Sequence, residues 1–296
     1  MIVIPGPASV ELGKEIAEQL KAEAVSVESK RFPDGESYIR FDDNMENESV
    51  VIVQTTSPPQ NENLIQLLLM ADTAKELGAK TITAVVPYIA YARQDKRFRS
   101  GESFSVKTIV KLLQSCGVNK IFTVNSHSPN VLKTLSLPIV DLPAISLLAQ
   151  HFKRQGLKDV FSLSLGKKGL DTAIEASRVL EGEYNVVSTQ RDTVTGIVTI
   201  EKKLLPIRNK DVVIFDDIIS SGGTMIKAVA WVKEQAAKSV YVACVHPLLI
   251  DDAKEKILKN GADGIVGTNT VPSPVSVVSV APLIVEALKN EMPTSG

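Results

Sequence analysis

The chain has 296 residues, which is enough for two ordinary domains that each bury a core of their own. Its composition, 44% hydrophobic and 23% charged, is that of a globular protein rather than a disordered or fibrous one. A formal net charge of −1 argues against bulk electrostatic binding of nucleic acid or of a membrane surface, so any binding of phosphate must be local.

The N-terminal residues lack the basic region and the long apolar stretch of a signal peptide. No run of the sequence reaches the roughly 18 apolar residues of a membrane-spanning helix. We therefore expect a cytoplasmic protein.

Short apolar runs alternate with helical patterns, which predicts strands separated by helices, parallel pairing and a doubly wound α/β architecture. The pattern occurs twice, with a proline-containing connection around residues 137–143. We therefore expect two similar domains, residues 1–141 and 142–296, with the last helix a candidate to pack back on the first domain. The expected strands are 2–4, 50–54, 81–86, 120–124, 160–164, 184–188, 212–215, 239–245 and 264–266.

The first loop with distinctive residues is Arg-Phe-Pro-Asp-Gly-Glu-Ser at 31–37. Proline and glycine favour a tight turn, which would present Phe32, Asp34 and Glu36 together. A polar turn ahead of a strand at 38–41 is an equally good interpretation of these residues alone.

A second segment, residues 86–99, follows a predicted strand at its carboxyl end, where ligands bind in open parallel sheets. It carries Arg93 and Gln94, and its four cations between residues 93 and 99 are suited to a triphosphate. Arg93 offers a planar fork for phosphate or for stacking on a base. A solvated basic loop is the alternative.

A histidine, His127, follows the next predicted strand. A lone histidine is more often structural than a ligand. At the carboxyl end of a strand beside the basic segment, however, it is well placed to bind Mg²⁺ or to polarise a phosphate.

The densest motif is the apolar run at 211–215, which is followed by Asp216, Asp217 and the Ser-Ser-Gly-Gly-Thr sequence at 220–224. It predicts a strand, a tight loop and a helix start whose amides and hydroxyls bind an anion. Two carboxylates would repel a phosphate unless a polyhydroxylated group lies between the acids and the phosphate. A ribose phosphate fits, because its diol can bind the acids while its phosphate binds the loop. The plain alternative is a capped strand-to-helix turn with a surface Asp pair.

This segment resembles the ribose-5-phosphate loop of type I phosphoribosyltransferases and of ribose-phosphate pyrophosphokinases. The Phe-Pro-Asp-Gly-Glu loop at 32–36 and the segment from Pro87 to Phe98, with Tyr88, Tyr91 and the Arg-Gln-Asp at 93–95, resemble the pyrophosphokinases and not the simple transferases. The resemblance covers nearly the full chain.

The resemblance implies two domains of the type I phosphoribosyltransferase kind and transfer of diphosphate from ATP to ribose 5-phosphate, for nucleotide biosynthesis. It implies Mg²⁺ as cofactor and a homo-oligomer, because the 32–36 loop of this family completes the nucleotide site of a neighbour. It implies no nucleic acid or membrane partner. The implied residues are Phe32, Asp34, Glu36, Arg93 and Gln94 for ATP, Asp216, Asp217, Ser220, Ser221, Gly222, Gly223 and Thr224 for ribose 5-phosphate, His127 for the metal and for catalysis, and Arg191 for catalysis.

Three positions depart from the family pattern. Asn125 and Gly166 stand where an Asp is expected, and Thr189 stands where a Lys is expected. Lys167 and Lys168 are candidates to replace the lost cation. Losing a cationic group from a phosphoryl-transfer site can cost ~10³-fold in rate.

The departures leave a second interpretation open, in which the chain is a catalytically impaired paralogue that assembles with an active homologue and regulates it. A third interpretation, transfer of phosphoribose to a base, shares only the 216–224 loop and gives the basic segment no role.

Overall fold

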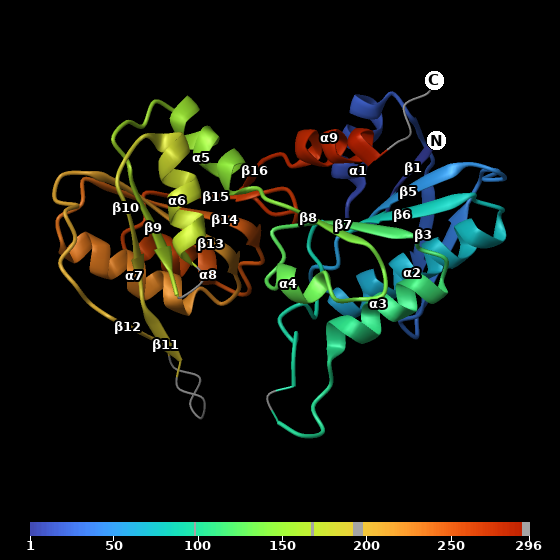
Figure 1. The fold of residues 1–296 in the computed structure, drawn as a ribbon, viewed down its shortest axis with the longest axis horizontal. Helices are drawn as coiled ribbons and strands as arrows, with labels where there is room; N and C mark the ends of the chain where they lie inside the picture. Colours follow the sequence, from blue (N-terminus) through green and yellow to red (C-terminus); the bar gives the residue numbers. More distant parts are fainter. Residues whose placement is uncertain (98, 167–168, 192–197, 292–296) are drawn as a thin grey trace. The chain divides into compact units, whose positions relative to one another are not determined.

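The computed structural model describes residues 1–97, 99–166, 169–191 and 198–291. The chain divides into two compact units (Figure 1). Unit 1 comprises Met1–Leu142, Thr270–Pro272 and Ser279–Gly296, and unit 2 comprises Pro143–Asn269 and Ser273–Val278.

Unit 1 is built on a six-stranded sheet with the order β2-β1-β5-β6-β7-β8, in which every neighbouring pair is parallel. Helices α1 and α9 lie on one face of this sheet, and α2 and α3 lie on the other (Figure 1). The strands are β1 (Ile2–Pro5), β2 (Glu23–Ala24), β5 (Ser49–Val53), β6 (Thr81–Val85), β7 (Lys120–Val124) and β8 (Ile139–Leu142). The helices are α1 (Val10–Leu20), α2 (Gln60–Glu76), α3 (Ser105–Ser115), α4 (Pro129–Leu132) and α9 (Ala281–Glu291).

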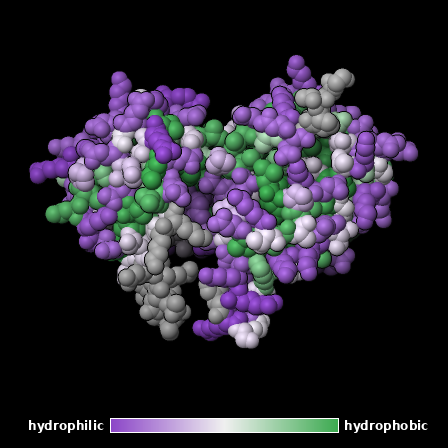
Figure 2. Space-filling view, in the orientation of Figure 1, coloured by the Kyte–Doolittle hydropathy of each residue, from purple (hydrophilic) through white to green (hydrophobic). Residues whose placement is uncertain are grey.

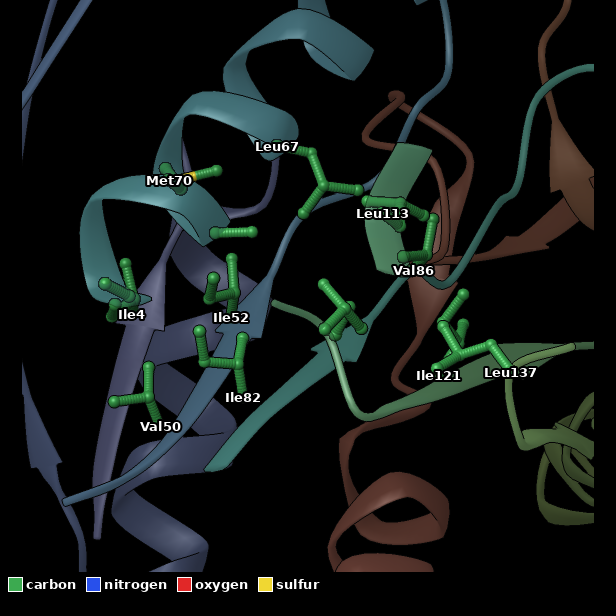
Figure 3. Packing of buried hydrophobic residues seen from close by; sticks show 14 of the residues in the cluster. Ile4, Val50, Ile52, Leu67, Met70, Ile82, Val86, Leu113, Ile121 and Leu137 are labelled. Carbon is green, nitrogen blue, oxygen red and sulfur yellow. The ribbon is translucent and has the colours of Figure 1, made fainter. Parts of the chain in front are cut away.

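The strands of unit 1 are apolar on both sides because helices cover both faces of the sheet. Ile4, Ile52 and Ile82 point to the same face and meet Leu67 and Met70 of α2 (Figure 3). These five side chains are at most 2% exposed. Their burial fixes the sheet on α2, including β6, which leads into the segment that carries Arg93 and Gln94.

Two additions complete unit 1. Strands β3 (Val27–Arg31) and β4 (Ser37–Phe41) form an antiparallel hairpin. Helix α9 packs on α1, where Ser279 Oγ donates to both carboxylate oxygens of Glu15 at 2.8 and 2.7 Å.

Unit 2 repeats the same topology with the strand order β10-β9-β13-β14-β15-β16, all parallel. Helices α5 and α6 lie on one face of the sheet, and α7 and α8 lie on the other (Figure 1). The strands are β9 (Phe161–Leu165), β10 (Tyr184–Val187), β13 (Asp211–Ile219), β14 (Ser239–Pro247), β15 (Gly264–Thr268) and β16 (Ser276–Val278), with β11 (Thr189–Arg191) and β12 (Val198–Ile200) as a separate antiparallel pair. The helices are α5 (Ile145–Arg154), α6 (Gly169–Leu180), α7 (Gly223–Glu234) and α8 (Ala253–Lys259).

The predicted fold class is confirmed, and each of the nine predicted strands is present. Two details of the prediction were wrong. The proline-containing connection at 137–143 holds the edge strand β8, and β13 continues through the two carboxylates to Ile219 because it stays paired with β14 as far as Pro247.

Among the helices in the described ranges, none is long and apolar enough to cross a membrane.

Candidate active site

Ligands of doubly wound sheets bind at the carboxyl ends of the strands, where the strand order reverses. In unit 2 this point lies between β9 and β13, which are paired up to Phe215 and Ser164. The Ser164 hydroxyl donates to the carbonyl of Phe215 at 3.1 Å and ties the two strand ends together. The sheet therefore brings the residues after β9 to the side of the 216–224 loop.

Asp216 and Asp217 lie near the carboxyl end of β13, and both are partly exposed. The backbone N–H of Asp217 donates to Asp216 Oδ1 at 2.9 Å, and that of Ile218 donates to Asp217 Oδ1 at 2.8 Å. Each carboxylate is thus oriented by the amide that follows it. The two acids form an adjacent pair at the edge where a ligand would lie.

The loop that follows is supported from behind by the chain after β14. The N–H of Leu249 donates to the carbonyl of Ile219 at 2.9 Å, and that of Ile250 donates to the carbonyl of Ser220 at 3.1 Å. Gly222 has a φ of +74°, and a Cβ there would lie 3.2 Å from Cδ1 of Ile257 in α8. The positive φ therefore favours glycine at this position, and a Cβ would in addition require Ile257 to shift slightly.

Helix α7 begins at Gly223, with Gly222 as its N-cap. Glycine has no side chain with which to cap the first amides of the helix, so these groups are presented toward the loop. Gly223 is exposed, and apart from its chain neighbours and the backbone of its own helix no atom of the described residues lies within 4 Å of the place its Cβ would take. The result is an open helix N-terminus, flanked by Ser221 and Thr224, that suits an anion.

Two of the departing positions, Gly166 and Thr189, are neighbours in space. Gly166 has a φ of +78°, and a Cβ there would lie 3.4 Å from Thr189 Oγ1. Arg191 lies in β11, and its side chain is outside the described part of the chain. Lys167 and Lys168 also lie outside the described residues.

In unit 1, the equivalent strand reversal, between β1 and β5, is filled by the unit's own side chains. Gln54 is fully buried there, accepts from the N–H of Ala8 at 2.9 Å and donates to Gln66 Oε1 at 3.2 Å. A Cβ on Gly6 would lie 2.4 Å from Gln54 Oε1. The predicted ligand residues Arg93, Gln94 and His127 lie instead after β6 and β7, and the others of unit 1 lie in the β3–β4 turn.

Arg93 and Gln94 belong to the long connection from β6 to α3, which presents mostly hydrophilic side chains (Figure 2). Gln94 Nε2 donates to the carbonyls of Lys96 and Ser103 at 3.2 and 3.4 Å. Gln94 therefore helps to shape this connection, whereas the Arg93 side chain is exposed.

His127 follows β7 and lies between two serines that are held by carboxylates. The N–H and Oγ of Ser126 donate to the carboxylate oxygens of Asp141 at 2.9 and 2.6 Å. Ser128 Oγ donates to Asp95. In the sequence Asp95 stands out only as part of the Arg-Gln-Asp motif, and Asp141 not at all, because these contacts depend on which segments are neighbours in the fold.

The loop at 32–36 closes the β3–β4 hairpin and brings its three predicted residues into one turn. The N–H of Phe32 donates to the carbonyl of Glu36 at 2.8 Å, and the N–H of Glu36 donates to Asp34 Oδ1 at 3.2 Å. Gly35 has a φ of +98°, which glycine tolerates best. Phe32 is 46% exposed and meets Tyr38 edge to face, with the ring centroids 6.0 Å apart.

Among the described residues, no group of three or more His, Cys, Asp or Glu side chains is placed to hold a metal ion. His127 contributes one nitrogen, whereas Mg²⁺ prefers oxygen ligands and is often bound through substrate phosphates. The described residues thus fit Mg²⁺ carried by a nucleotide better than a cage made by the protein.

The two units are parallel α/β sheets of the same topology. In unit 2 an acid pair on β13 is followed by an open helix N-terminus. This combination defines a protein of the phosphoribosyltransferase type. A family model for the phosphoribosyl transferase domain matches residues 139–282, and a model for the N-terminal domain of ribose phosphate pyrophosphokinase matches residues 1–117. The chain belongs to the ribose-phosphate pyrophosphokinase family, whose members are transferases.

Similar proteins cover nearly the whole chain. A ribose-phosphate pyrophosphokinase of Saccharolobus solfataricus is 40% identical over 272 residues, which cover 92% of this chain and 93% of the relative. That of Methanothermobacter thermautotrophicus is 38% identical over 289 residues, covering 98% and 100%. The crystal structure of phosphoribosylpyrophosphate synthetase from Mycobacterium smegmatis superposes with a TM-score of 0.85 at 26% identity, covering 98% of this chain and 97% of that one.

Proposed function

We propose that the chain transfers the diphosphoryl group of ATP to the anomeric hydroxyl of ribose 5-phosphate, giving 5-phosphoribosyl 1-diphosphate and AMP. The hydroxyl oxygen forms a bond to the β-phosphorus, the bond from that phosphorus to the α–β bridging oxygen breaks, and the hydroxyl proton is released. The acid pair of β13 and the open N-terminus of α7 support the ribose 5-phosphate part of this proposal. The observation that carries the choice of ATP as donor is the match of residues 1–117 to the N-terminal domain of ribose phosphate pyrophosphokinase.

In this proposal Asp216 and Asp217 accept hydrogen bonds from the ribose diol. The amides at Gly222 and Gly223, with the hydroxyls of Ser220, Ser221 and Thr224, hold the 5-phosphate. A helix N-terminus supplies both N–H donors and a favourable dipole for a dianion. Because the acids and the phosphate site lie at different places along one loop, a single sugar phosphate can bind the acids through its diol and the helix N-terminus through its phosphate.

ATP is assigned to unit 1 and to the turn at 32–36. Arg93 and Gln94 would bind the nucleotide, and Phe32, with 46% of its surface exposed, would lie against the adenine. Asp34 and Glu36 would accept hydrogen bonds from the base. The proposal includes a homo-oligomer, in which this turn completes the nucleotide site of a neighbouring subunit.

Mg²⁺ is part of the proposal as the ion that accompanies ATP, and His127 is the residue assigned to the metal–phosphate end. When bound, the ion would neutralise charge on the phosphates. Arg191 is assigned to the charge on the transferring group. Since the site uses ATP and a sugar phosphate, we place the protein in the cytoplasm.

The proposal is tested by giving the purified chain two sets of reactants. ATP with ribose 5-phosphate should yield AMP, whereas 5-phosphoribosyl 1-diphosphate with purine or pyrimidine bases should yield no nucleotide. Formation of nucleotide from the second set would replace the proposal with base transfer. If neither set reacts until a homologue with the complete motifs is added, the chain is a regulatory partner instead.

A further inference from the structure

We propose that Asp141 and Asp95 are positioning residues that hold His127 in place by fixing the two serines on either side of it. The inference rests on the proposed function, because it gives His127 the catalytic role assigned above. It assigns these two acids to support of the histidine rather than to contact with the substrate.

The two serines beside His127 are held by two different segments of unit 1. Asp141 lies on β8 and takes both hydrogen bonds that Ser126 can donate, from the N–H at 2.9 Å and from Oγ at 2.6 Å. Asp95 lies in the long connection from β6 to α3 and accepts from Ser128 Oγ. Strands β6 and β8 are the two neighbours of β7 in the sheet. His127 is therefore the residue between two serines, one held by the neighbouring strand β8 and the other by the connection that follows β6.

The backbone at this point has left the regular strand. Asn125 has a φ of +41°, in the left-handed region that asparagine tolerates better than most residues. Its N–H still donates to the carbonyl of Leu142 at 2.9 Å, but β7 ends at Val124. Beyond Asn125, the two serine contacts restrain the turn that carries the histidine.

Ser128 gives an independent indication that its hydroxyl is used for this purpose. It stands at the N-cap of α4, where a serine normally accepts a hydrogen bond from a helix amide, a contact worth ~1 kcal/mol. Here the hydroxyl donates to Asp95 instead of capping the helix. The Ser128 hydroxyl thus makes no cap hydrogen bond to α4 and instead contacts Asp95, 33 residues earlier in the sequence.

Asp141 also lies in a partly buried environment that disfavours an ionised carboxylate. Burial raises its pKa, while the two hydrogen bonds from Ser126 and the charge of Lys133 act in the opposite direction. A partly buried acid that takes two hydrogen bonds from one serine fits a role in fixing that serine.

The experiment uses the full chain with Asp141→Asn, Ser126→Ala, Asp95→Asn and Ser128→Ala. Ser239→Ala is the matched control, since Ser239 Oγ donates to Asp211 at 2.6 Å at the opposite, amino-terminal edge of the unit 2 sheet. The chain has three histidines, so the ring signals of His127 can be followed by NMR against those of His151 and His246. The four test variants should shift the His127 signals and leave the other two in place, and the control should change none.

Turnover provides the second readout. Each test variant should lower kcat for AMP formation by ~10- to 100-fold, the size expected for a reacting group misplaced by about 1 Å, with melting temperatures near that of the control. In a His127→Ala background, Asp141→Asn should cause no further loss, because its effect acts through the histidine.

Three results overturn the inference: unchanged His127 signals, a shift of all three histidines together, or an equal loss of kcat with and without His127. Failure of the proposed function would look different. In that case His127→Ala would leave AMP formation unchanged or the chain would form no AMP, while the NMR comparison would still decide whether the two acids hold the histidine.

Discussion

Gly166 and Thr189 lie against each other, since a Cβ on Gly166 would be 3.4 Å from Thr189 Oγ1. The resemblance to the pyrophosphokinases places an acid at the first position and a lysine at the second. The two departures therefore occupy one place in unit 2. A carboxylate at 166 and a lysine ammonium group at 189 would be close enough to interact, so we treat the two substitutions as a single change.

Restoring both groups by Gly166→Asp with Thr189→Lys should raise the rate of AMP formation by ~10-fold or more, equivalent to ~1.4 kcal/mol. Gly166→Asp alone should do less and should lower the melting temperature by a few degrees, because its φ of +78° strains a residue with a side chain. Rates and thermal unfolding of the two single variants and the double variant measure the coupling.

Gly156→Asp is the control for strain, since Gly156 has a φ of +86° and no atom of the described residues lies within 4 Å of its Cβ position. It should lose a similar amount of stability with no change in rate. Independent effects of the two restored groups, equal to the product of the single changes, would show that they do not act as a pair.

Gly223→Asp should abolish the binding of ribose 5-phosphate while the fold is kept. The position is open, so the side chain fits, but its charge would repel the phosphate at the N-terminus of α7. Calorimetry with ribose 5-phosphate measures the loss. Gly223→Ala is the matched control and should bind nearly as well as the wild type, and unchanged affinity in the Asp variant would exclude this loop as the phosphate site.

Phe32→Ala should weaken ATP binding and raise the KM for ATP by ~10-fold, because the exposed ring is assigned to the adenine. Tyr184→Ala is the control, since Tyr184 is also 46% exposed but lies on β10 of unit 2. Light scattering should show that the wild-type chain self-associates. A monomer that binds ATP equally well with and without Phe32 would contradict the assignment.

Asp263 should make stability depend on pH. Burial alone would raise its pKa, but the hydrogen bond and charge of Lys233, at 2.8 Å, and the N–H of Val240, at 2.7 Å, lower it overall. A carboxyl whose pKa is lower in the folded state stabilises the fold above its unfolded pKa, near 3.8, and loses that contribution as pH falls through the folded pKa.

Asp263→Asn should therefore lower the free energy of unfolding at pH 7, by less than about 1 kcal/mol because the group is partly exposed. The difference from the wild type should shrink as the pH is lowered toward 4 and below in urea titrations. A difference that is constant over this range would show that the ionised carboxylate is not responsible.

The strand pattern was visible in the sequence because the parallel strands are buried on both faces and appear as short apolar runs. Strand β8 was missed because Pro138, Asp141 and Pro143 make its segment look like a connection. The extension of β13 was missed because Asp216 and Asp217 end the apolar run, although pairing with β14 continues past them.

The candidate site was predictable where its residues are consecutive, as in the 220–224 loop. It was not predictable where contacts join different strand ends. Asp95 and Asp141 lie 33 and 15 residues from the serines that they hold. The pairing of β7 with β8 brings Asp141 to Ser126, and the path of the connection after β6 brings Asp95 to Ser128. The contact of Gly166 with Thr189 likewise depends on the parallel pairing of β9 with β10, the strand that leads into Thr189.

The most direct test of the account is to identify the products that the purified chain forms from ATP, Mg²⁺ and ribose 5-phosphate, with phosphorus NMR to follow the β-phosphate of ATP. The account predicts AMP and 5-phosphoribosyl 1-diphosphate in equal amounts, the β-phosphate being attached to C1 of the ribose, and loss of both products in Gly223→Asp but not in Gly223→Ala. A rate below the roughly 1–100 s⁻¹ of typical kinases would agree with the missing groups at 166 and 189. Formation of ADP, or of AMP without ribose 5-phosphate, would contradict the account.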